Sequence, residues 1–464
     1  MSINVTLVNP PYPERGHHHP PFITVGLGYL GAVLEKNGYK VNLIDCQAQK
    51  LTLADFESEI GKYQPKILGI TSTTLTYKSA LKVAEITKKV HSNCLTVLGG
   101  CHATFWDDKA LEESPSLDVI VRKEGEYTFL EIADRVKEEK PIKGVLGTTC
   151  RENGKITRNP DRPYIQNLDE LPFPAYHLFP IEAFRRNGKV IFPMLASRGC
   201  VYCCDFCTAV RMFGQKHRAR SPKNVVDEIE SVTKQYGNDQ FSFYDDLFTL
   251  DPKWVMEICK EIRSRNLKIK WDCETRLDMV TKDLLLTMRK AGCNVIWFSL
   301  EAGSQRILDA MGKGFTKEQT IRAYKLAKEV GMMTIANVVL GFPGETPESA
   351  WETIKFVQEV GPDDVGYNIA TPYPGTAMYY QVKKKGWLKI EDFDYYDTAT
   401  ATFETPTMSM KELQEIHERA YREFYLRPTY FFRMLFKGGT FGISAAKTSF
   451  ARLLRALGYK FSHR

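Results

Sequence analysis

Three closely spaced cysteines have the clearest chemical meaning in this chain. Cys200, Cys204 and Cys207 stand in the run Ser-Arg-Gly-Cys-Val-Tyr-Cys-Cys-Asp-Phe-Cys, a C-x-x-x-C-x-x-C array that follows the apolar stretch 190–195. Thiolates are soft ligands that suit iron–sulfur clusters. Three of them leave one iron of a [4Fe–4S] cluster without a protein ligand, and that iron can bind a small molecule and pass it an electron. The array therefore predicts a redox enzyme with a small molecule at iron.

A zinc knuckle is the structural alternative for the same cysteines. It needs a fourth ligand at matching spacing, usually a second C-x-x-C or a His pair, and none follows. Cys203 is the nearest spare thiol, but it neighbours Cys204, so its side chain should point elsewhere. The remaining cysteines are scattered, which favours buried thiols and argues against a second cluster, and hence against a methylthiotransferase.

Composition limits the class of protein. The chain has 464 residues, 43% of them hydrophobic and 26% charged, as in ordinary globular proteins of several domains. Eleven cysteines without a visible secretory signal indicate a reducing, cytoplasmic compartment. No apolar stretch is long enough to span a bilayer. The net charge of +7 is modest, and no basic run interleaved with aromatic residues indicates a nucleic-acid partner.

Residues 1–140 alternate short apolar strands with helical segments. This alternation is typical of a doubly wound, Rossmann-like α/β domain, whose ligands bind beyond the carboxyl ends of the strands. The expected strands are 5–9, 40–45, 67–71, 95–99 and 119–121, and the expected helices include 27–36 and 80–90. The loops after these strands hold Pro10-Pro11, Ser72-Thr73-Thr74, Gly99-Gly100-Cys101-His102 and Glu124-Gly125-Glu126.

Three further segments complete the expected organisation. Residues 141–188 are rich in Pro, Asn and Gly, which predicts a hairpin over 144–156 and then an extended linker. Residues 189–375 return to strand-then-helix order, and six such units predict a partial or full TIM-type (β/α) barrel. Residues 376–464 are expected to form a helical C-terminal domain with a basic tail. The expected barrel strands are 190–195, 241–244, 268–273, 295–299, 334–340 and 365–369.

A glycine-rich run near the N-terminus resembles a dinucleotide fingerprint. Gly26-Leu27-Gly28-Tyr29-Leu30-Gly31 spells G-x-G-x-x-G, and Asp45 ends the next expected strand. A dinucleotide site needs these glycines directly after the first strand, whereas here a Pro- and His-rich loop intervenes. We therefore interpret the glycines as sites of close helix packing. His17-His18-His19 lies in that loop, and because adjacent side chains point in different directions, we favour a loop or substrate-lid role over a metal site.

The cysteine array is similar to the signature of the radical S-adenosylmethionine (SAM) enzymes, whose open iron binds the amino and carboxylate groups of SAM. By this resemblance Phe206 would lie against the adenine, and Arg276 would pair with the methionine carboxylate. Glu301 and Ser304 would contact SAM or substrate, and Gly341 would lie near the adenine. The motifs that carry the resemblance after the later strands are Phe243-Tyr244-Asp245-Asp246, Cys273-Glu274-Thr275-Arg276, Ser299-Leu300-Glu301-Ala302-Gly303-Ser304 and Gly341-Phe342-Pro343-Gly344-Glu345-Thr346, with Asp246 as the acidic contact of the second strand.

The N-terminal loops resemble the cobalamin-binding half of one subgroup of these enzymes, and the resemblance runs from about residue 5 to residue 375. Gly99 and Gly100 would let the backbone approach a large planar ligand, and hydroxyls at 72–74 could hydrogen-bond a buried nucleotide tail. The Asp-x-His-x-x-Gly motif of other cobalamin enzymes is absent. We therefore expect no histidine on cobalt and place Leu75 beside its lower face. The implied cobalamin contacts are Pro10, Pro11, Ser72, Thr73, Thr74, Gly99, Gly100, His102, Glu124, Gly125 and Glu126.

The resemblance implies three cofactors, a [4Fe–4S] cluster, SAM and cobalamin, and an external one-electron reductant. SAM would be cleaved to methionine and a 5′-deoxyadenosyl radical, which removes hydrogen from an unactivated sp³ carbon. That carbon would then take the methyl group of methylcobalamin, which a second SAM regenerates. The implied activity is a C-methyltransferase acting on a peptide or protein, with glutamine C-methylation as one case, or on a small molecule or lipid.

Two alternatives stay open at this point: an oxidative cyclase or rearrangement enzyme with the same motifs, and a non-catalytic cobalamin sensor or carrier. Two tyrosines also carry two interpretations. Tyr367 ends the last expected barrel strand and Tyr373 follows in Pro-Tyr-Pro-Gly. Both either pack in the core and its turn or form a wall of the substrate pocket.

Overall fold

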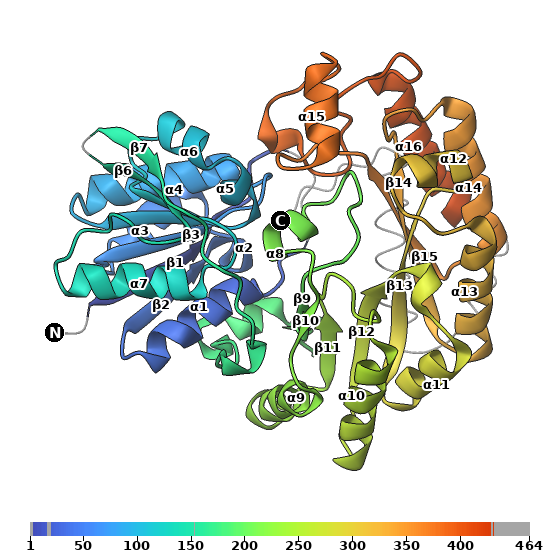
Figure 1. The fold of residues 1–464 in the computed structure, drawn as a ribbon, viewed down its shortest axis with the longest axis horizontal. Helices are drawn as coiled ribbons and strands as arrows, with labels where there is room; N and C mark the ends of the chain where they lie inside the picture. The colour runs from blue at the N-terminus through green and yellow to red at the C-terminus, as the bar shows by residue number, and fades with distance from the viewer. Residues whose placement is uncertain (1–2, 16–19, 153, 428–429, 431–464) are drawn as a thin grey trace.

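The computed structural model describes residues 3–15, 20–152, 154–427 and 430. Figure 1 shows two α/β units side by side, with the C-terminal helices above and beside the second unit. The histidine tract at 17–19, the hairpin-turn residue Asn153 and the basic tail after 430 lie outside the described residues.

The first unit contains a seven-stranded sheet in the order β2-β1-β3-β4-β5-β6-β7, with helices on both faces, as predicted. Strands β1 to β5 run parallel, so their carboxyl ends lie along one edge. The strands are β1 (Asn4–Asn9), β2 (Lys40–Asp45), β3 (Ile67–Thr71), β4 (Leu95–Gly99), β5 (Val119–Val121), β6 (Thr148–Glu152) and β7 (Lys155–Arg158). The helices are α1 (Val25–Lys36), α2 (Cys46–Gln49), α3 (Leu53–Ile60), α4 (Tyr77–Val90), α5 (Cys101–Phe105), α6 (Asp107–Glu113) and α7 (Glu126–Lys137).

The hairpin belongs to this sheet. We predicted it as part of a separate connecting segment, but β6 pairs antiparallel with β5, and β7 with β6. The hairpin therefore covers an edge that β5 would otherwise expose, which protects the sheet from edge-to-edge pairing. The chain then crosses to the second unit through three short 3-10 helices, at Leu168–Glu170, Tyr176–Leu178 and Ile181–Phe184.

The second unit is a partial barrel. Its six parallel strands follow the order β15-β14-β13-β12-β11-β8, with helices on the outside. The strands are β8 (Phe192–Met194), β11 (Gln240–Phe243), β12 (Lys270–Thr275), β13 (Cys293–Glu301), β14 (Met333–Leu340) and β15 (Asp364–Ile369). A small ladder joins β9 (Ser197–Arg198) to β10 (Arg218–Ala219). The helices are α8 (Ala209–Phe213), α9 (Pro222–Tyr236), α10 (Pro252–Ser264), α11 (Lys282–Lys290), α12 (Gln305–Ala310), α13 (Lys317–Glu329) and α14 (Pro347–Val360), with a 3-10 turn at Leu277–Met279.

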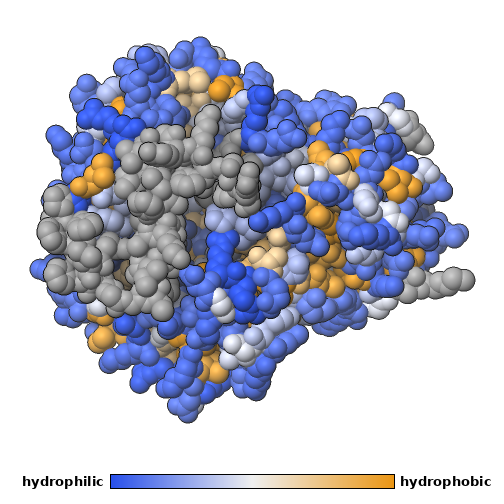
Figure 2. Space-filling model, turned by 180° about the vertical axis from the view of Figure 1, so that it is seen from behind, coloured by the Kyte–Doolittle hydropathy of each residue, from blue (hydrophilic) through white to orange (hydrophobic). Residues whose placement is uncertain are grey.

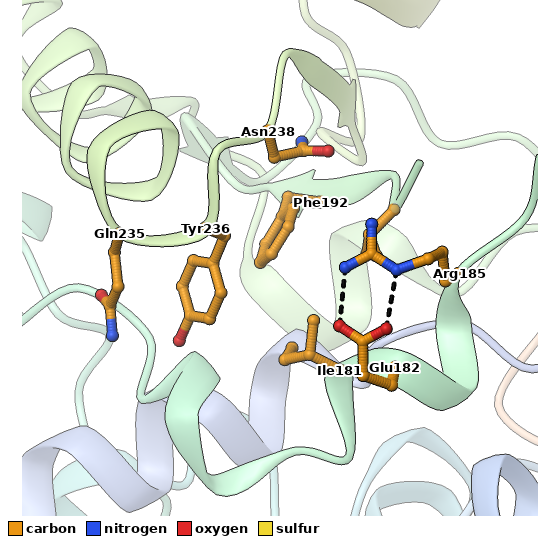
Figure 3. A pocket seen from close by; sticks show the side chains of 8 residues that line it. Ile181, Glu182, Arg185, Phe192, Gln235, Tyr236 and Asn238 are labelled. Carbon is orange, nitrogen blue, oxygen red and sulfur yellow. Dashed lines mark hydrogen bonds and ion pairs between the residues drawn. The ribbon is translucent and has the colours of Figure 1, made fainter. Parts of the chain in front are cut away.

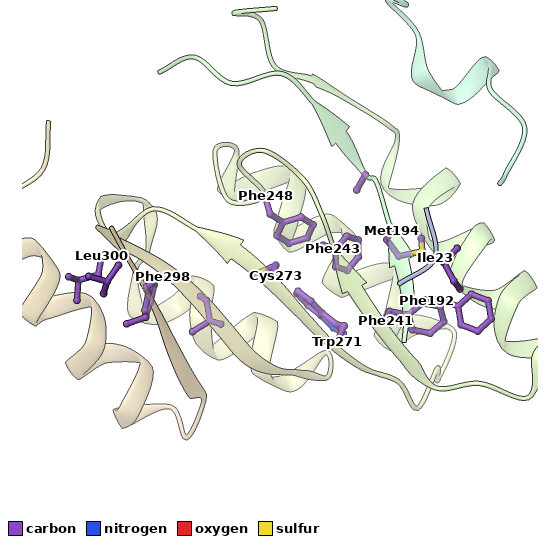
Figure 4. Close-up of a cluster of buried hydrophobic side chains, with 14 of the residues drawn as sticks. Ile23, Phe192, Met194, Phe241, Phe243, Phe248, Trp271, Cys273, Phe298 and Leu300 are labelled. Atoms are coloured by element: carbon purple, nitrogen blue, oxygen red, sulfur yellow. The ribbon is translucent and has the colours of Figure 1, made fainter. Parts of the chain in front are cut away.

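The two faces of this second sheet differ in character. Side chains that point toward the helices form a close-packed core, with Phe243, Phe248 and Trp271 in mutual edge-on and tilted contacts (Figure 4). The other face carries polar side chains as well, and Asp272 and Glu274 of β12 alternate with the buried Trp271 and Cys273. Because side chains alternate along a strand, one strand supplies both the hydrophobic core and a polar inner face.

The C-terminal region packs against the second unit, where α16 (Met410–Tyr425) contacts β15 and α14. It also contains α15 (Ala377–Lys384) and a 3-10 turn (Phe393–Tyr395), and Ser409 begins α16 with a capping box to Glu412. None of the helices among the described residues combines the length and hydropathy that crossing a bilayer requires. From behind, hydrophilic residues cover most of the visible surface, and apolar residues gather on the N-terminal unit (Figure 2).

Candidate active site between the two units

The loop that carries the three cysteines is fixed at its base. Gly199 has φ of 93°, and a Cβ there would lie 2.4 Å from the carbonyl oxygen of Lys216, so the turn requires glycine. The Gly199 N–H donates to the Asp246 carboxylate at 2.9 Å. The Ser197 hydroxyl donates to Asp245 at 2.5 Å. The acidic second-strand motif, which we expected to contact SAM, therefore holds the cysteine loop in place.

Two of the three cysteines, Cys204 and Cys207, lie on one turn. The Cys207 N–H donates to the Cys204 carbonyl at 3.1 Å, and Cys200 stands just before this turn. Burial raises the pKa of all three thiols, that of Cys207 to about 12, and repulsion from neighbouring sulfurs adds to the rise at Cys200 and Cys207. Bound iron would offset this cost, because a metal ion favours the thiolate. No three His, Cys, Asp or Glu side chains of the described residues are arranged around a single metal ion.

Arg276 lies beside the cysteine loop. Its guanidinium is 3.7 Å from the ring centre of Tyr202, a residue between the first two cysteines. Nε and Nη2 donate to Asp278 at 3.0 and 2.9 Å. Arg276 is only 5% exposed, and its Nη1 is buried without a hydrogen-bond partner. A buried donor without a partner is costly, so this nitrogen fits an anionic group such as the SAM carboxylate.

A buried ion pair faces the same loop, and the sequence predicted one of its two residues. Glu301 was predicted, but Lys313 was not. Lys313 Nζ lies 2.9 Å from Glu301 Oε1 and 5.7 Å from the ring centre of Phe206. The feature of the sequence that could have indicated Lys313 is a lysine placed between the apolar residues Met311 and Phe315. Ser304 is buried at the N-terminus of α12, beside this pair in the chain.

The glycine-rich segment after β14 reaches the aromatic residue of the cysteine loop. Phe342 and Phe206 pack edge to face with ring centres 6.3 Å apart. The Gly341 N–H donates to the buried Glu345 carboxylate, whose pKa burial raises to about 7. A Cβ at Gly341 would lie 2.4 Å from the Leu413 side chain of α16. Close packing against α16 is thus one reason for this glycine, and its place near the adenine stays a prediction.

A cavity of about 160 Å³ lies where the carboxyl ends of β3, β4 and β5 meet the second unit. A void of about this size holds a single aromatic ring, so it has room for part of a large cofactor and not for the whole of it. Gly26 and Leu27 of the G-x-G-x-x-G run also line it, whereas Gly28 and Gly31 pack against Pro174 and Leu178, as the packing interpretation predicts. Its other lining residues include Gly69, Gly99, Gly100, Lys123, Glu124, Gly125, Glu126, Leu195, Arg198, Met212 and Phe213.

Several predicted cobalamin contacts form bonds within the protein instead. Ser72 donates its hydroxyl to the Gly99 carbonyl, and Thr73 bonds to Thr76. The Thr74 hydroxyl lies 3.1 Å from His102 Nδ1. These hydroxyls fix the loop after β3, and none of residues 72–74 lines the cavity, whose lining ends with Thr71 of β3. Hydrogen bonds from 72–74 to a nucleotide tail stay a prediction.

His102 is a core residue of the first unit. It is 2% exposed, its ring centre lies 4.2 Å from that of Tyr77 and 4.7 Å from that of Phe393, and burial lowers its pKa to about 3. Pro10 and Pro11 are buried, and the Pro10 carbonyl accepts from Gln47. Leu75 is half-buried in the loop after β3, and its place beside cobalt stays a prediction.

Glu124 and Glu126 connect the two units. Both carboxylates pair with Arg198, two residues before the first cysteine, at 3.1 and 2.6 Å, and Glu124 also pairs with Arg218 at 2.9 Å. We predicted these glutamates as direct cobalamin contacts. They line the cavity, but their ion pairs make them the link to the cysteine loop as well.

The two candidate substrate tyrosines have different surroundings. Tyr367 is 2% exposed and packs edge to face against Tyr421 of α16, on the helix side of the second sheet. This burial favours the core interpretation for Tyr367, and its place in a wall of the substrate pocket stays a prediction. Tyr373 is half-buried, and its hydroxyl donates to the Tyr396 carbonyl at 3.3 Å.

A second cavity, of about 320 Å³, lies at the opposite end of the second sheet. Tyr236 at the end of α9 and Asn238 just after it face the Glu182–Arg185 ion pair across it (Figure 3). In a (β/α) barrel this end serves stability rather than catalysis. The cysteines and the ion pairs described above all lie away from it.

Comparisons with known proteins agree with the geometry. The radical SAM superfamily model matches residues 194–357, and the B12-binding domain model matches residues 18–133. The chain is 34% identical over 449 residues to an uncharacterized methyltransferase of Pyrococcus horikoshii, covering 96% of this chain and 97% of the relative. It is 30% identical over 444 residues to the anaerobic magnesium-protoporphyrin IX monomethyl ester cyclase of Rubrivivax gelatinosus, covering 92% and 78%.

The fold is also that of a solved radical SAM enzyme. The radical SAM methyltransferase TsrM of Kitasatospora setae, with cobalamin and a [4Fe–4S] cluster bound, superimposes with a TM-score of 0.74 at 18% identity, covering 92% of this chain and 90% of that one. The chain belongs to the cobalamin-dependent radical SAM methyltransferase family of enzymes. Its cofactors are a [4Fe–4S] cluster, SAM and cobalamin. Since the family consists of enzymes, the non-catalytic sensor is set aside.

Proposed function

We propose that the protein is a radical C-methyltransferase that methylates an unactivated sp³ carbon in a peptide or protein. Glutamine C-methylation of methyl-coenzyme M reductase is the specific case that the size and layout of the chain favour. The observation that carries the proposal is the shared wall of the two cofactor regions, because Arg198 both lines the cobalamin cavity and adjoins the cysteine loop. The 34% identity to a named methyltransferase over nearly the whole length supports it.

The cluster, once bound, supplies one electron to SAM, and cobalamin supplies a methyl group. The protein's own residues orient these partners. Arg276 offers its unpaired Nη1 to the amino-acid end of SAM, and the Lys313–Glu301 pair fixes two charges beside the same loop. Phe206 and Phe342 provide an apolar surface for the adenine and exclude water from a reactive radical. Radical SAM enzymes take the electron from an external reductant, and eleven free cysteines favour the reducing cytoplasm as the compartment.

The inner face of the second sheet favours an amide-bearing substrate. Burial raises the pKa of Asp272 to about 6 and also raises that of Glu274, yet Glu274 is exposed to the hollow inside the sheet. Asn337 and Ser299 donate to Glu274 Oε1 at 3.0 and 3.1 Å. A glutamine side chain or peptide N–H could donate to the remaining carboxylate oxygen. An all-hydrocarbon lipid would cover the second carboxylate oxygen of Glu274 without offering it a donor, which is costly.

The test is anaerobic turnover of the reconstituted enzyme with trideuteromethyl SAM and glutamine-containing peptides of methyl-coenzyme M reductase. We expect one trideuteromethyl group to replace one hydrogen on the glutamine side chain, located by tandem mass spectrometry. The Cys204→Ala variant is the control and should give no product. Labelled product on a lipid or small molecule, with none on the peptides, would contradict the proposed substrate class.

A cyclase is the second candidate, because of the 30% identity to the Rubrivivax gelatinosus protein. A cyclase would consume SAM and change the substrate by loss of hydrogen, without taking up the label. The same mass-spectrometric experiment therefore separates the two reactions.

A further inference from the structure

Four buried charges join the cobalamin cavity to the cysteine loop. We call Glu124, Glu126, Arg198 and Arg218 the charge bridge. Their side chains are between 4% and 7% exposed, and the ion-pair distances lie between 2.6 and 3.1 Å. Glu124 comes from the loop after β5 and Glu126 begins α7, both in the first unit, and the arginines come from the β9–β10 ladder in the second. The bridge is therefore the polar contact across which one unit can affect the other.

The two glutamates are not equivalent. Glu124 is saturated: Arg198 and Arg218 donate to it at 3.1 and 3.0 Å, and the Ile165 N–H donates at 2.8 Å. Glu126 receives one donor, Arg198 Nη2 at 2.6 Å on Oε1. Its Oε2 is buried without a hydrogen-bond partner, and Glu126 lines the cavity. Glu124 is thus an anchor, while Glu126 has one carboxylate oxygen left for an N–H or O–H donor on the occupant of the cavity.

Arg198 is linked directly to the cysteine loop. It pairs with Arg218 in the two-residue β9–β10 ladder, and Gly199, the next residue, is bound through its N–H to Asp246. Its guanidinium also lies 5.3 Å from the ring centre of Tyr29 of α1. Cys200 follows two residues later, so a shift of the Arg198 side chain has a short covalent path to the first cluster ligand.

We propose that Glu126 and Arg198 couple the two cofactor sites: a donor from bound cobalamin fixes Glu126, Glu126 fixes Arg198, and Arg198 positions the cysteine loop for SAM. Arg198 is a positioning residue in this account and touches neither SAM nor the reacting carbon. Coupling of this kind is reciprocal, so SAM must tighten cobalamin binding by the factor by which cobalamin tightens SAM binding. The inference rests on binding of the two cofactors and not on methyl transfer, so it can fail or hold independently of the proposed reaction.

The experiment measures the dissociation constant of SAM on the cluster-reconstituted protein, with and without saturating hydroxocobalamin. The readout is the SAM-induced change in the electron paramagnetic resonance spectrum of the reduced cluster. In the wild type we expect cobalamin to tighten SAM binding by about 5-fold or more, the lower end of measured couplings. In Glu126→Gln, which keeps an oxygen for Arg198 but loses the second carboxylate oxygen, we expect the factor to fall to near 1. Arg198→Lys should give the same loss of coupling.

The matched control is Arg220→Lys, because Arg220 forms a similarly buried pair with Glu228 at 2.5 Å that does not line the cavity. This variant should keep the wild-type coupling factor. A wild-type factor of 1 would overturn the proposal, as would a factor in Glu126→Gln equal to that of the wild type. If Arg198→Lys fails to fold, Glu126→Gln and the reciprocal measurement, cobalamin binding followed by visible absorbance with and without SAM, decide the question alone.

Discussion

Removing Lys313 from its buried pair should destabilise the second unit strongly. Lys313 and Glu301 lie 2.9 Å apart with side chains 6% and 8% exposed. At an effective dielectric constant of 20, charges at this distance attract by about 6 kcal/mol before desolvation is counted. Removing one partner of such a pair costs about 3–5 kcal/mol, because the other charge is left buried alone. Glu301 also has a left-handed φ of 61° at a register shift between β13 and β14, a conformation that its partner helps to hold.

Lys313→Met should therefore lower the free energy of unfolding by about 3–5 kcal/mol, measured by denaturant titration of the anaerobic protein. The double variant Lys313→Met/Glu301→Gln should be more stable than the single one, since it buries no lone charge. Lys282→Met is the control, because Lys282 and Glu329 also lie 2.9 Å apart but are 59% and 37% exposed, and it should cost below about 1 kcal/mol. Equal losses in Lys313→Met and Lys282→Met would refute the reasoning.

Three more predictions concern the cofactor regions. Cys204→Ala should abolish the iron–sulfur absorbance of the reconstituted protein while cobalamin still binds; retained absorbance would exclude the assigned ligands. Gly100→Ala should weaken cobalamin binding at least about 10-fold, since Gly100 has φ of 96° and a Cβ there would lie 2.5 Å from the Ser72 carbonyl oxygen; unchanged affinity in a titration would contradict this. The pKa of His102 falls from 6.5 to about 3 on folding, so the unfolded state binds the extra proton between those values and stability is lost as pH falls below 6.5. His102→Gln should remove that part of the pH dependence of the unfolding free energy, by up to about 1.4 kcal/mol per pH unit, and an unchanged profile would count against it.

The sequence predicted the fold well where local patterns decide it. Runs such as Lys40–Asp45 and Leu95–Gly99 are strands with the predicted bounds, because their apolar residues are bounded by turn-forming ones. The pairing of β6 with β5 was not predictable in the same way, since it depends on an edge that exists after the sheet has formed.

The site was predictable as a set of positions and less so as a set of contacts. The motif order identified Arg276, Glu301 and the three cysteines, which the fold brings to one loop region. Lys313 was missed because its pairing with Glu301 is a contact of the folded chain that no sequence motif marks. Tyr367 kept two interpretations because whether a strand residue faces the helices or the hollow depends on register, and a shift of one residue reverses it.

The most direct test of the central claim is the stoichiometry of one anaerobic turnover. A cobalamin-dependent radical methyltransferase that acts on an sp³ carbon must form one 5′-deoxyadenosine and one S-adenosylhomocysteine for each methylated product. We predict equal amounts of all three with the wild type and none with Cys204→Ala. Product formation with 5′-deoxyadenosine but without S-adenosylhomocysteine would contradict methyl transfer and indicate a cyclase or rearrangement enzyme instead.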